Sequence, residues 1–593
     1  MRRLRASGLV VGIVTTMSVF GVTAPLDAAT AKTCTPGPGA DLSGCNLART
    51  NLAGKNLSGA NLTGASLKGA DVTGANLSKA VLAGTTIINT KLAKANLTGV
   101  SSGKAVGPAA SLPSGWRLVK GYLIGPGANL QSAKLNGASL VGANLSRATL
   151  ASASVNAANL TNANLSLTNL NHTTLTDTKL NGVKSGGILG TPLRLPINWR
   201  LAQGYLVGAG ANLANAALAG ANLKTANFKG TNLEGAKLAG ADLFGVTSGG
   251  IKGTPASLPD SWSVVKGYLV GPGANLKNAN LNNADLTGTT LTGAFLAAAT
   301  FTGATLDHVV SGDVTGVPAS LPTDWRLVGG YLVGPAANLN GANLKNAVLR
   351  SVNLAGADLT GADFTRADLG GANLNGTTLD GTILAGSALT GVRSGEITGD
   401  PASLPIHWQV VNGFLAGPGA NLNGADFTGV DLTGATLTGV NLNGATLDGA
   451  DFTGADLTDA VLSNASVDGA TFTDANLTRV TSGGVTGTAA AQPTSWRLRN
   501  GYFVGPTSNL NGANLAGEAL NGFNLTGATL TGANLTNTVL NGANLTGANL
   551  TSAVLTGANL TNATITNATW THAICPDGTN ADGDGGTCAN NLS

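Results

Sequence analysis

Six tryptophans recur with a fixed aromatic partner and are the residues of this sequence best suited to contact a ligand. Each Trp is followed five residues later by a Gly, and an aromatic residue comes directly after that Gly. The pairs are Trp116 with Tyr122, Trp199 with Tyr205, Trp262 with Tyr268, Trp325 with Tyr331, Trp408 with Phe414 and Trp496 with Tyr502. Such rings stack well on sugars or cationic groups, so we treat them as candidate binding residues. The alternative is that they pack their own segment onto the rest of the fold.

The four cysteines form two close pairs, Cys34 with Cys45 and Cys575 with Cys588. In an exported chain this spacing predicts two local disulfides, one near each end. Residues 1–31 indicate export, because arginines, an apolar run and a small-residue cleavage site follow one another as in a signal peptide. Residues 42–45 also resemble a bacterial lipid-attachment box, but they lie far beyond the apolar run.

Groups that could hold a metal or catalyse a reaction are sparse. Asn580, Asp582 and Asp584 match the opening of a calcium-binding loop, but Asn591 stands where that loop needs a bidentate Glu. The alternative is a turn held by the second disulfide. The four histidines have no second ligand at metal-binding spacing. We therefore predict no enzymatic activity and no cofactor.

The composition disfavours several classes of partner. A formal net charge of +4 over 593 residues is too small for a protein that binds or mimics nucleic acid. Beyond the signal peptide no run of 18 or more apolar residues predicts a membrane span. With 86 glycines and only 10% charged residues, the chain instead has the bias of a repeat protein.

A period of five residues dominates the sequence. In the unit that ends at Gly64, Ala60 and Leu62 fall on one side of a short strand and Asn61 on the other, because strand side chains alternate. We expect Leu62 and its equivalents inside and the Asn or Asp before each one in water. The units form seven blocks, residues 40–99, 128–182, 211–245, 274–308, 337–391, 420–479 and 508–572.

This A(N/D)LxG pattern resembles the pentapeptide repeat family over nearly the whole chain. The resemblance implies an all-β fold, a right-handed parallel quadrilateral β-helix with four units in each coil. Short caps are expected at residues 32–39 and 573–593.

Six inserts of 28 residues separate the blocks, at residues 100–127, 183–210, 246–273, 309–336, 392–419 and 480–507. Turn signals such as Asn412-Gly413 between apolar residues predict a β-hairpin in each. The alternative is that the coil continues through the insert. If each insert advances the coil by one side or by five, the block lengths place the first five tryptophans in a row on one face and Trp496 a quarter turn away.

These features predict a secreted, non-enzymatic structural or binding scaffold, extracellular or associated with the cell envelope, whose partner the sequence does not identify. The alternative is multivalent binding of glycans, or of a cell-envelope surface protein, through the aromatic residues of the inserts. A third hypothesis follows from the family resemblance, since cytoplasmic relatives inhibit DNA gyrase by mimicking DNA. Export and a net charge near zero oppose it.

Overall fold

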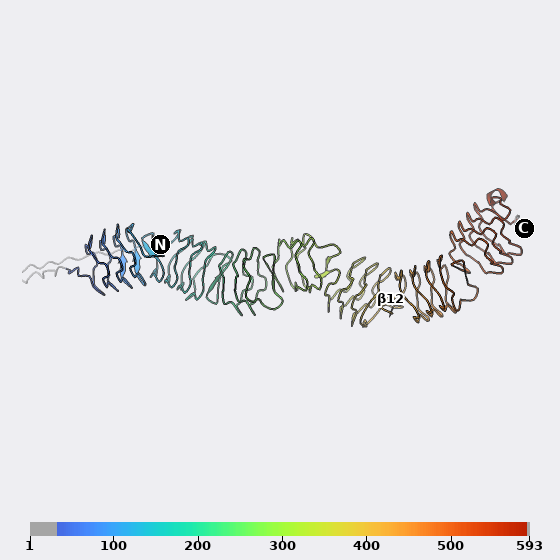
Figure 1. Ribbon diagram of the computed structural model, residues 1–593, viewed down its shortest axis with the longest axis horizontal. Coiled ribbons are helices and arrows are strands. Elements are labelled where there is room, and N and C mark those ends of the chain that lie inside the picture. Colours follow the sequence, from blue (N-terminus) through green and yellow to red (C-terminus); the bar gives the residue numbers. More distant parts are fainter. Residues whose placement is uncertain (1–31, 590–593) are drawn as a thin grey trace, which may run out of the picture. The chain divides into compact units, whose positions relative to one another are not determined.

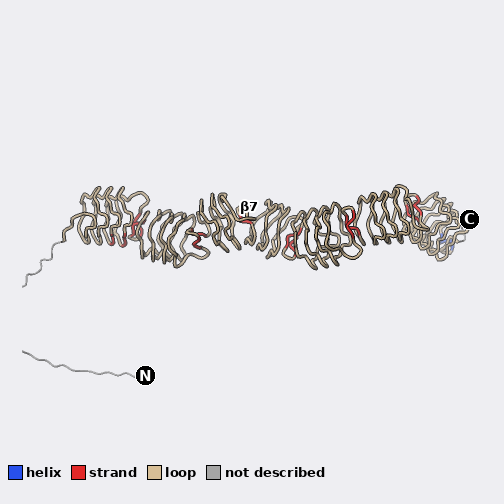
Figure 2. Tube along the Cα trace, turned by 90° about the horizontal axis from the view of Figure 1, so that it is seen from below, coloured by secondary structure: helices blue, strands red, loops and turns tan. Residues whose placement is uncertain are grey.

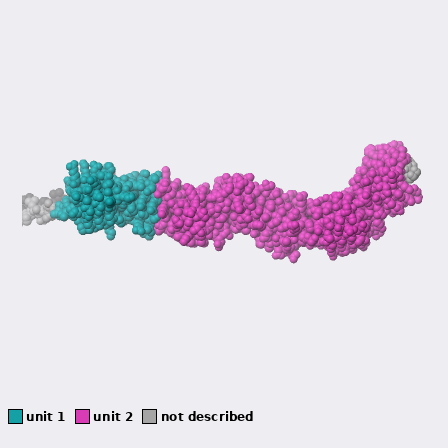
Figure 3. Space-filling model, in the orientation of Figure 1, with its two compact units in different colours: residues 1–159, 163–175, 189–194 teal, residues 160–162, 176–188, 195–593 magenta. Residues whose placement is uncertain are grey.

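The computed structural model describes residues 32–589, so the predicted signal peptide at residues 1–31 lies outside the described residues. The chain divides into two compact units (Figure 3). The first runs to residue 159 and adds residues 163–175 and 189–194, and the second holds the remainder. Each unit is a stack of coils (Figure 1).

The coils are four-sided. Single parallel bridges join residues that are 20 apart, such as Asn61 with Val81 in the first unit and Asn441 with Val461 in the second. Twenty residues are four units of five, so each unit of sequence forms one side of a coil. The predicted parallel β-solenoid is therefore confirmed. The right-handed sense of the coil remains what the family resemblance implies.

Backbone hydrogen bonds between coils explain why the repeat has five residues. The N–H of Leu442 donates to the carbonyl of Val461 in the next coil at 2.8 Å, and the N–H of Asn441 donates to Ala420 in the previous coil at 2.9 Å. The chain then turns a corner at Gly444, whose φ of 66° is in the left-handed region that favours glycine. Each side thus contributes a minimal strand and each corner a turn.

The interior of the coils is filled by the central leucines and the small residues two positions before them. Leu442 is 0% exposed, and Ala445, which stands two positions before Leu447, is 1% exposed. The Asn or Asp before each central residue faces outward, as Asn441 does. The predicted inward positions are confirmed, since all are at most 1% exposed: Leu62, Leu145, Leu223, Leu286, Leu359, Leu442 and Leu545.

Regular strands are short and most of them belong to the inserts (Figure 2). Strands β1 (Val81–Ala83) and β2 (Ser101–Gly103) pair in parallel. One antiparallel hairpin occurs in each insert, which confirms the predicted hairpins. They are β3/β4 (Arg117–Val119, Tyr122–Ile124), β5/β6 (Arg200–Ala202, Tyr205–Val207), β7/β8 (Ser263–Val265, Tyr268–Val270), β9/β10 (Arg326–Val328, Tyr331–Val333), β11/β12 (Gln409–Val411, Phe414–Ala416) and β13/β14 (Arg497–Arg499, Tyr502–Val504).

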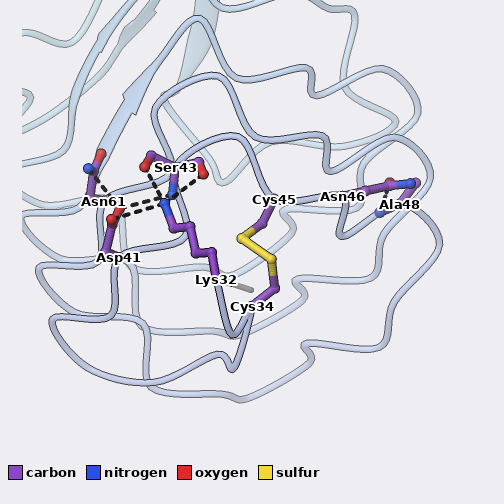
Figure 4. The surroundings of a disulfide bond; sticks show 8 residues. All are labelled: Lys32, Cys34, Asp41, Ser43, Cys45, Asn46, Ala48 and Asn61. Carbon is purple, nitrogen blue, oxygen red and sulfur yellow. Dashed lines mark hydrogen bonds and ion pairs between the residues drawn. A yellow bond between two sulfur atoms is a disulfide. The ribbon is translucent and has the colours of Figure 1, made fainter. Parts of the chain in front are cut away.

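Both predicted disulfides are present. Cys34 and Cys45 are joined with their Cα atoms 5.8 Å apart, and beside them Lys32 forms an ion pair with Asp41 at 2.9 Å (Figure 4). That ion pair contributes to holding the pKa of Asp41 down at about 2. The second disulfide joins Cys575 to Cys588 next to the one-turn 3-10 helix η1 (Ala581–Asp584). Between residues 32 and 589 no helix is long and apolar enough to cross a membrane.

Candidate functional site

Each insert is one enlarged coil. In the fifth insert three sides continue the regular ladder, because Arg393, Thr398 and Ser403 each pair with the residue 20 positions earlier. The hairpin β11/β12 replaces the fourth side. Arg393 then pairs with Asn421, 28 residues later, so the eight extra residues are absorbed within a single turn of the coil.

The hairpin closes the hydrophobic interior on both of its faces. Val410 pairs with Leu415 and Val411 with Phe414 across the two strands. Val410 and Leu415 pack against the core of the preceding block, while Val411, Phe414 and Ala416 pack against the core of the following block. This division follows from the alternation of side chains along a strand. We call this two-faced hairpin a plate, because it lies between two cores. Around β9/β10 the cores of the fourth and fifth blocks form one continuous cluster.

The candidate tryptophans pack against a glycine of the same plate. A methyl group placed on Gly417 would lie 2.3 Å from Cδ2 of Trp408, so the indole rests directly on that glycine. Trp325 and Trp496 are 9% and 5% exposed, and the other four are half-buried. The same contact, at 2.1 to 2.3 Å, recurs at Gly125, Gly208, Gly271, Gly334 and Gly505. Sequence analysis missed this partner, although a Gly stands nine residues after every one of these tryptophans.

The tyrosines repair the backbone ladder that the plate interrupts. The hydroxyl of Tyr331 accepts the backbone N–H of Asn343 at 3.1 Å, where a regular coil would offer a carbonyl. Four other tyrosines accept the N–H twelve residues ahead in the same way, Tyr122, Tyr205, Tyr268 and Tyr502. Phe414 has no hydroxyl and instead packs edge-on against Phe427, with 5.2 Å between ring centroids.

A serine in each insert provides a second acceptor, and sequence analysis overlooked it. The buried Oγ of Ser394 accepts the N–H of Leu415 at 2.8 Å. The equivalent bonds, 2.8 or 2.9 Å long, are made by Ser102, Ser185, Ser248, Ser311 and Ser482. The signal was a serine two residues after the first Val of every insert. The serine, tyrosine and glycine that recur at matching positions of the inserts therefore have a structural role.

The predicted row of tryptophans is wrong. In the second unit, blocks of 7, 7 and 11 units separate successive plates, and each insert completes one whole coil, as the bridges Thr247 to Asn275 and Val310 to Asn338 require. Each plate therefore lies one side away from the plate before it. The sixth block has 12 units, so Trp408 and Trp496 share a side. The prediction failed because it let the insert advance the coil by one side or five, whereas it advances by four.

The C-terminal acidic residues form a capped turn. The side chain of Asn580 accepts the N–H of Asp582 at 2.9 Å and caps η1. Two hydrogen bonds from His572 lower the pKa of Asp582. The larger effect comes from the backbone N–H and the smaller one from the ring. Asp584 accepts the hydroxyl of Thr579 at 2.8 Å. Within residues 32–589 no three His, Cys, Asp or Glu side chains gather where they could hold a metal ion.

Comparison with known proteins identifies the repeat. The family model described as Pentapeptide repeats (8 copies) matches well over half of the chain. Its matches, which overlap in places, cover residues 40–101, 127–184, 209–245, 273–307, 336–393, 419–481 and 508–567. None of the curated proteins matches the sequence.

Several solved structures are similar to parts of the chain. HetL of Nostoc sp. strain PCC 7120, described as involved in heterocyst differentiation regulation, is 26% identical, with a TM-score of 0.13 and coverage of 52% of this chain and 91% of its own. Rfr23 of the cyanobacterium Cyanothece 51142 is 23% identical, with a TM-score of 0.07 and coverage of 26% and 88%. Full-length QnrB1, a plasmid-mediated fluoroquinolone resistance protein, is 14% identical, with a TM-score of 0.10 and coverage of 38% and 85%. These low TM-scores carry no structural argument.

Proposed function

Because the chain belongs to the pentapeptide repeat family, we propose that it is a non-enzymatic binding scaffold that presents ladders of polar side chains along its coils. The observation that carries this proposal is the regular outward ladder over a filled interior. Asn421 and Asn441, for example, are stacked on one side, and the amide of Asn441 donates to the Asn421 oxygen at 3.3 Å. Such ladders repeat at about 4.8 Å, the spacing of neighbouring strands, and so suit an extended, repetitive partner.

We further propose that the scaffold works outside the cytoplasm. The two disulfides support this location, because such bonds persist in oxidising compartments. Expression of the full chain in a bacterial host should place it in the periplasm or the medium, with a new N-terminus at residue 32. A cytoplasmic protein that retains residues 1–31 would contradict the proposed export.

The tryptophans and tyrosines of the inserts stay a predicted binding set, but their contacts favour packing. The indole of Trp408 rests on Gly417, and the hydroxyl of Tyr331 is already engaged by a backbone N–H. We therefore place binding on the polar ladders. The aromatic residues keep the plates in position.

The direct test is a binding assay of the exported protein. Purified full-length mature chain would be incubated with insoluble cell-envelope polysaccharide and, separately, with intact envelopes, and bound protein would be measured after sedimentation. We expect saturable binding to at least one of them. An unrelated disulfide-bonded secreted protein of similar charge serves as the control. Binding no stronger than that control would contradict the scaffold proposal.

A further inference from the structure

The outer surface has a recess where the fifth insert meets the sixth block. It has a volume of about 460 Å³ and is lined by Asn375, Arg393, Ser394, Asn421, Asn423 and Asn441. None of these side chains is acidic. The recess arises where Arg393 pairs with Asn421 across the enlarged coil, next to the buried Ser394 that holds the plate.

Arg393 interrupts a ladder of asparagines on this side of the coil. Parallel bridges stack Asn353, Asn373, Arg393, Asn421 and Asn441 in that order. Below the arginine the Asn373 amide donates to the Asn353 oxygen at 3.1 Å, and above it the Asn441 amide donates to the Asn421 oxygen at 3.3 Å. At the arginine the chain of amide bonds stops, because a guanidinium cannot accept a hydrogen bond.

The sixth insert shows what a satisfied version of this position looks like. Thr481 stands in the place of Arg393, and its hydroxyl accepts the amide of Asn509 at 2.8 Å. The nearby Arg479 is paired with Asp459 at 2.6 Å. In the fifth insert, by contrast, neither the Arg393 guanidinium nor the Asn421 amide nitrogen has a partner among the described residues. The recess therefore concentrates hydrogen-bond donors.

We propose that this recess binds the carboxylate of an acidic sugar, so that the Asn353 to Asn441 ladder holds a segment of a uronic-acid polysaccharide. A guanidinium binds a carboxylate through two parallel hydrogen bonds, and the free Asn421 donor lies beside it. The side-chain amides of Asn375 and Asn423 each offer a donor and an acceptor, which suits sugar hydroxyls. The coil spacing of about 4.8 Å is comparable to one sugar residue of an extended chain. This inference rests on the proposed scaffold function and names its ligand class.

The experiment compares the exported full-length protein with Arg393→Thr, which adopts the residue of the sixth insert. Binding to polygalacturonate would be measured by isothermal titration calorimetry in low and moderate salt, with fully methyl-esterified polygalacturonate and polyglutamate as further probes. Arg366→Thr, which removes an exposed arginine at a corner of the fifth block away from the Asn353 to Asn441 ladder, is the matched control. Circular dichroism melting curves check that both variants fold.

We expect native protein and Arg366→Thr to bind polygalacturonate alike and Arg393→Thr to bind at least about tenfold more weakly, since a charge-assisted pair is lost. The methyl ester should bind weakly, and salt should reduce the affinity for the acid form. Equal binding by Arg393→Thr, or equal binding of polyglutamate by the native protein, would overturn the proposal. If envelopes are bound but polygalacturonate is not, this inference fails while the scaffold proposal stands.

Discussion

A regular coil of the sixth block and the enlarged coil of the fifth insert differ in how they satisfy their backbone N–H groups and cover the core. In the block, all four sides bond to the coils before and after, as Asn441 does with Asn421 and Val461. Of the sides of the enlarged coil, only that of Arg393 bridges to the following block. The plate fills the remaining gap with apolar faces, and Ser and Tyr hydroxyls accept backbone N–H groups. A β-solenoid can therefore lose most of a ladder if side chains replace its acceptors and its core is sealed.

The largest expected effect comes from truncating leucines on the two sides of this comparison. Leu442→Ala in the sixth block and Leu415→Ala in the plate each remove a side chain that is 0% exposed, and each should cost about 2–5 kcal/mol. The two variants should destabilise different regions of the chain. Hydrogen exchange should rise around residues 420–479 for Leu442→Ala but in the fifth block for Leu415→Ala, because Leu415 packs on the preceding core. Identical exchange patterns would mean that the plate does not separate the cores.

A smaller loss is expected from Gly417→Ala. The added methyl group would meet the Trp408 ring at 2.3 Å, and overpacking of this kind costs about 1–3 kcal/mol. Gly583→Ala is the control, because nothing lies within 4 Å of its added carbon. Urea unfolding followed by Trp fluorescence measures both. A Gly417→Ala protein as stable as the control would show that the indole is not fixed on the glycine.

Removing one hydroxyl tests the acceptors that replace the ladder. Tyr331→Phe deletes the partner of the Asn343 N–H and should cost about 0.5–1.5 kcal/mol. Phe414→Tyr is the reverse change, since it offers a hydroxyl to the N–H of Asp426, which has no hydrogen-bond partner among the described residues. We expect a small gain there. Chemical denaturation of both variants and of the native chain measures the free energy of unfolding. If it is unchanged in both variants, the tyrosine hydroxyls do not stabilise the interrupted ladder.

The smallest expected effect is a pH dependence at the end of the sixth block. A hydrogen bond from Arg479 lowers the pKa of the Asp459 carboxyl below its ordinary value of 3.8. Because this pKa is lowered in the folded state, the pair stabilises the fold above about pH 3.8, the ordinary pKa of the group. This contribution is lost as the pH falls through the lowered pKa. Arg479→Thr should therefore narrow the difference in melting temperature between pH 6 and pH 3. The change is expected to be slight, because both side chains are more than half exposed.

The interior of the blocks could be predicted from sequence because every unit repeats the same choice of residues. Leu442 and Ala445 stand in positions whose side follows from strand alternation and the period of five. The hairpins were also predictable, since Asn412-Gly413 lies between apolar strands. These features depend on local pattern alone.

The sequence did not reveal that the coil continues through the inserts, because large apolar and small residues exchange their usual positions there. In the fifth insert Val392 and Ile397 occupy the positions that hold small residues in a block, while Ser394 and Gly399 occupy the leucine positions. The period of five therefore continues without its usual residues. Likewise, the contact between Trp408 and Gly417 depends on how two strands fold back on one another. Neither spacing nor composition reveals such a contact until the hairpin is placed in three dimensions.

The plates bear on how a gene for such a protein can grow. A copied segment that contains one block and one insert carries its own seal, so its addition would leave no apolar surface at the new junction. The serine, tyrosine and glycine positions that close the junction travel within the copy. Lengthening by whole segments would therefore not depend on what the protein binds, and the residues that all six inserts share can reflect copying of such segments as well as a common structural role.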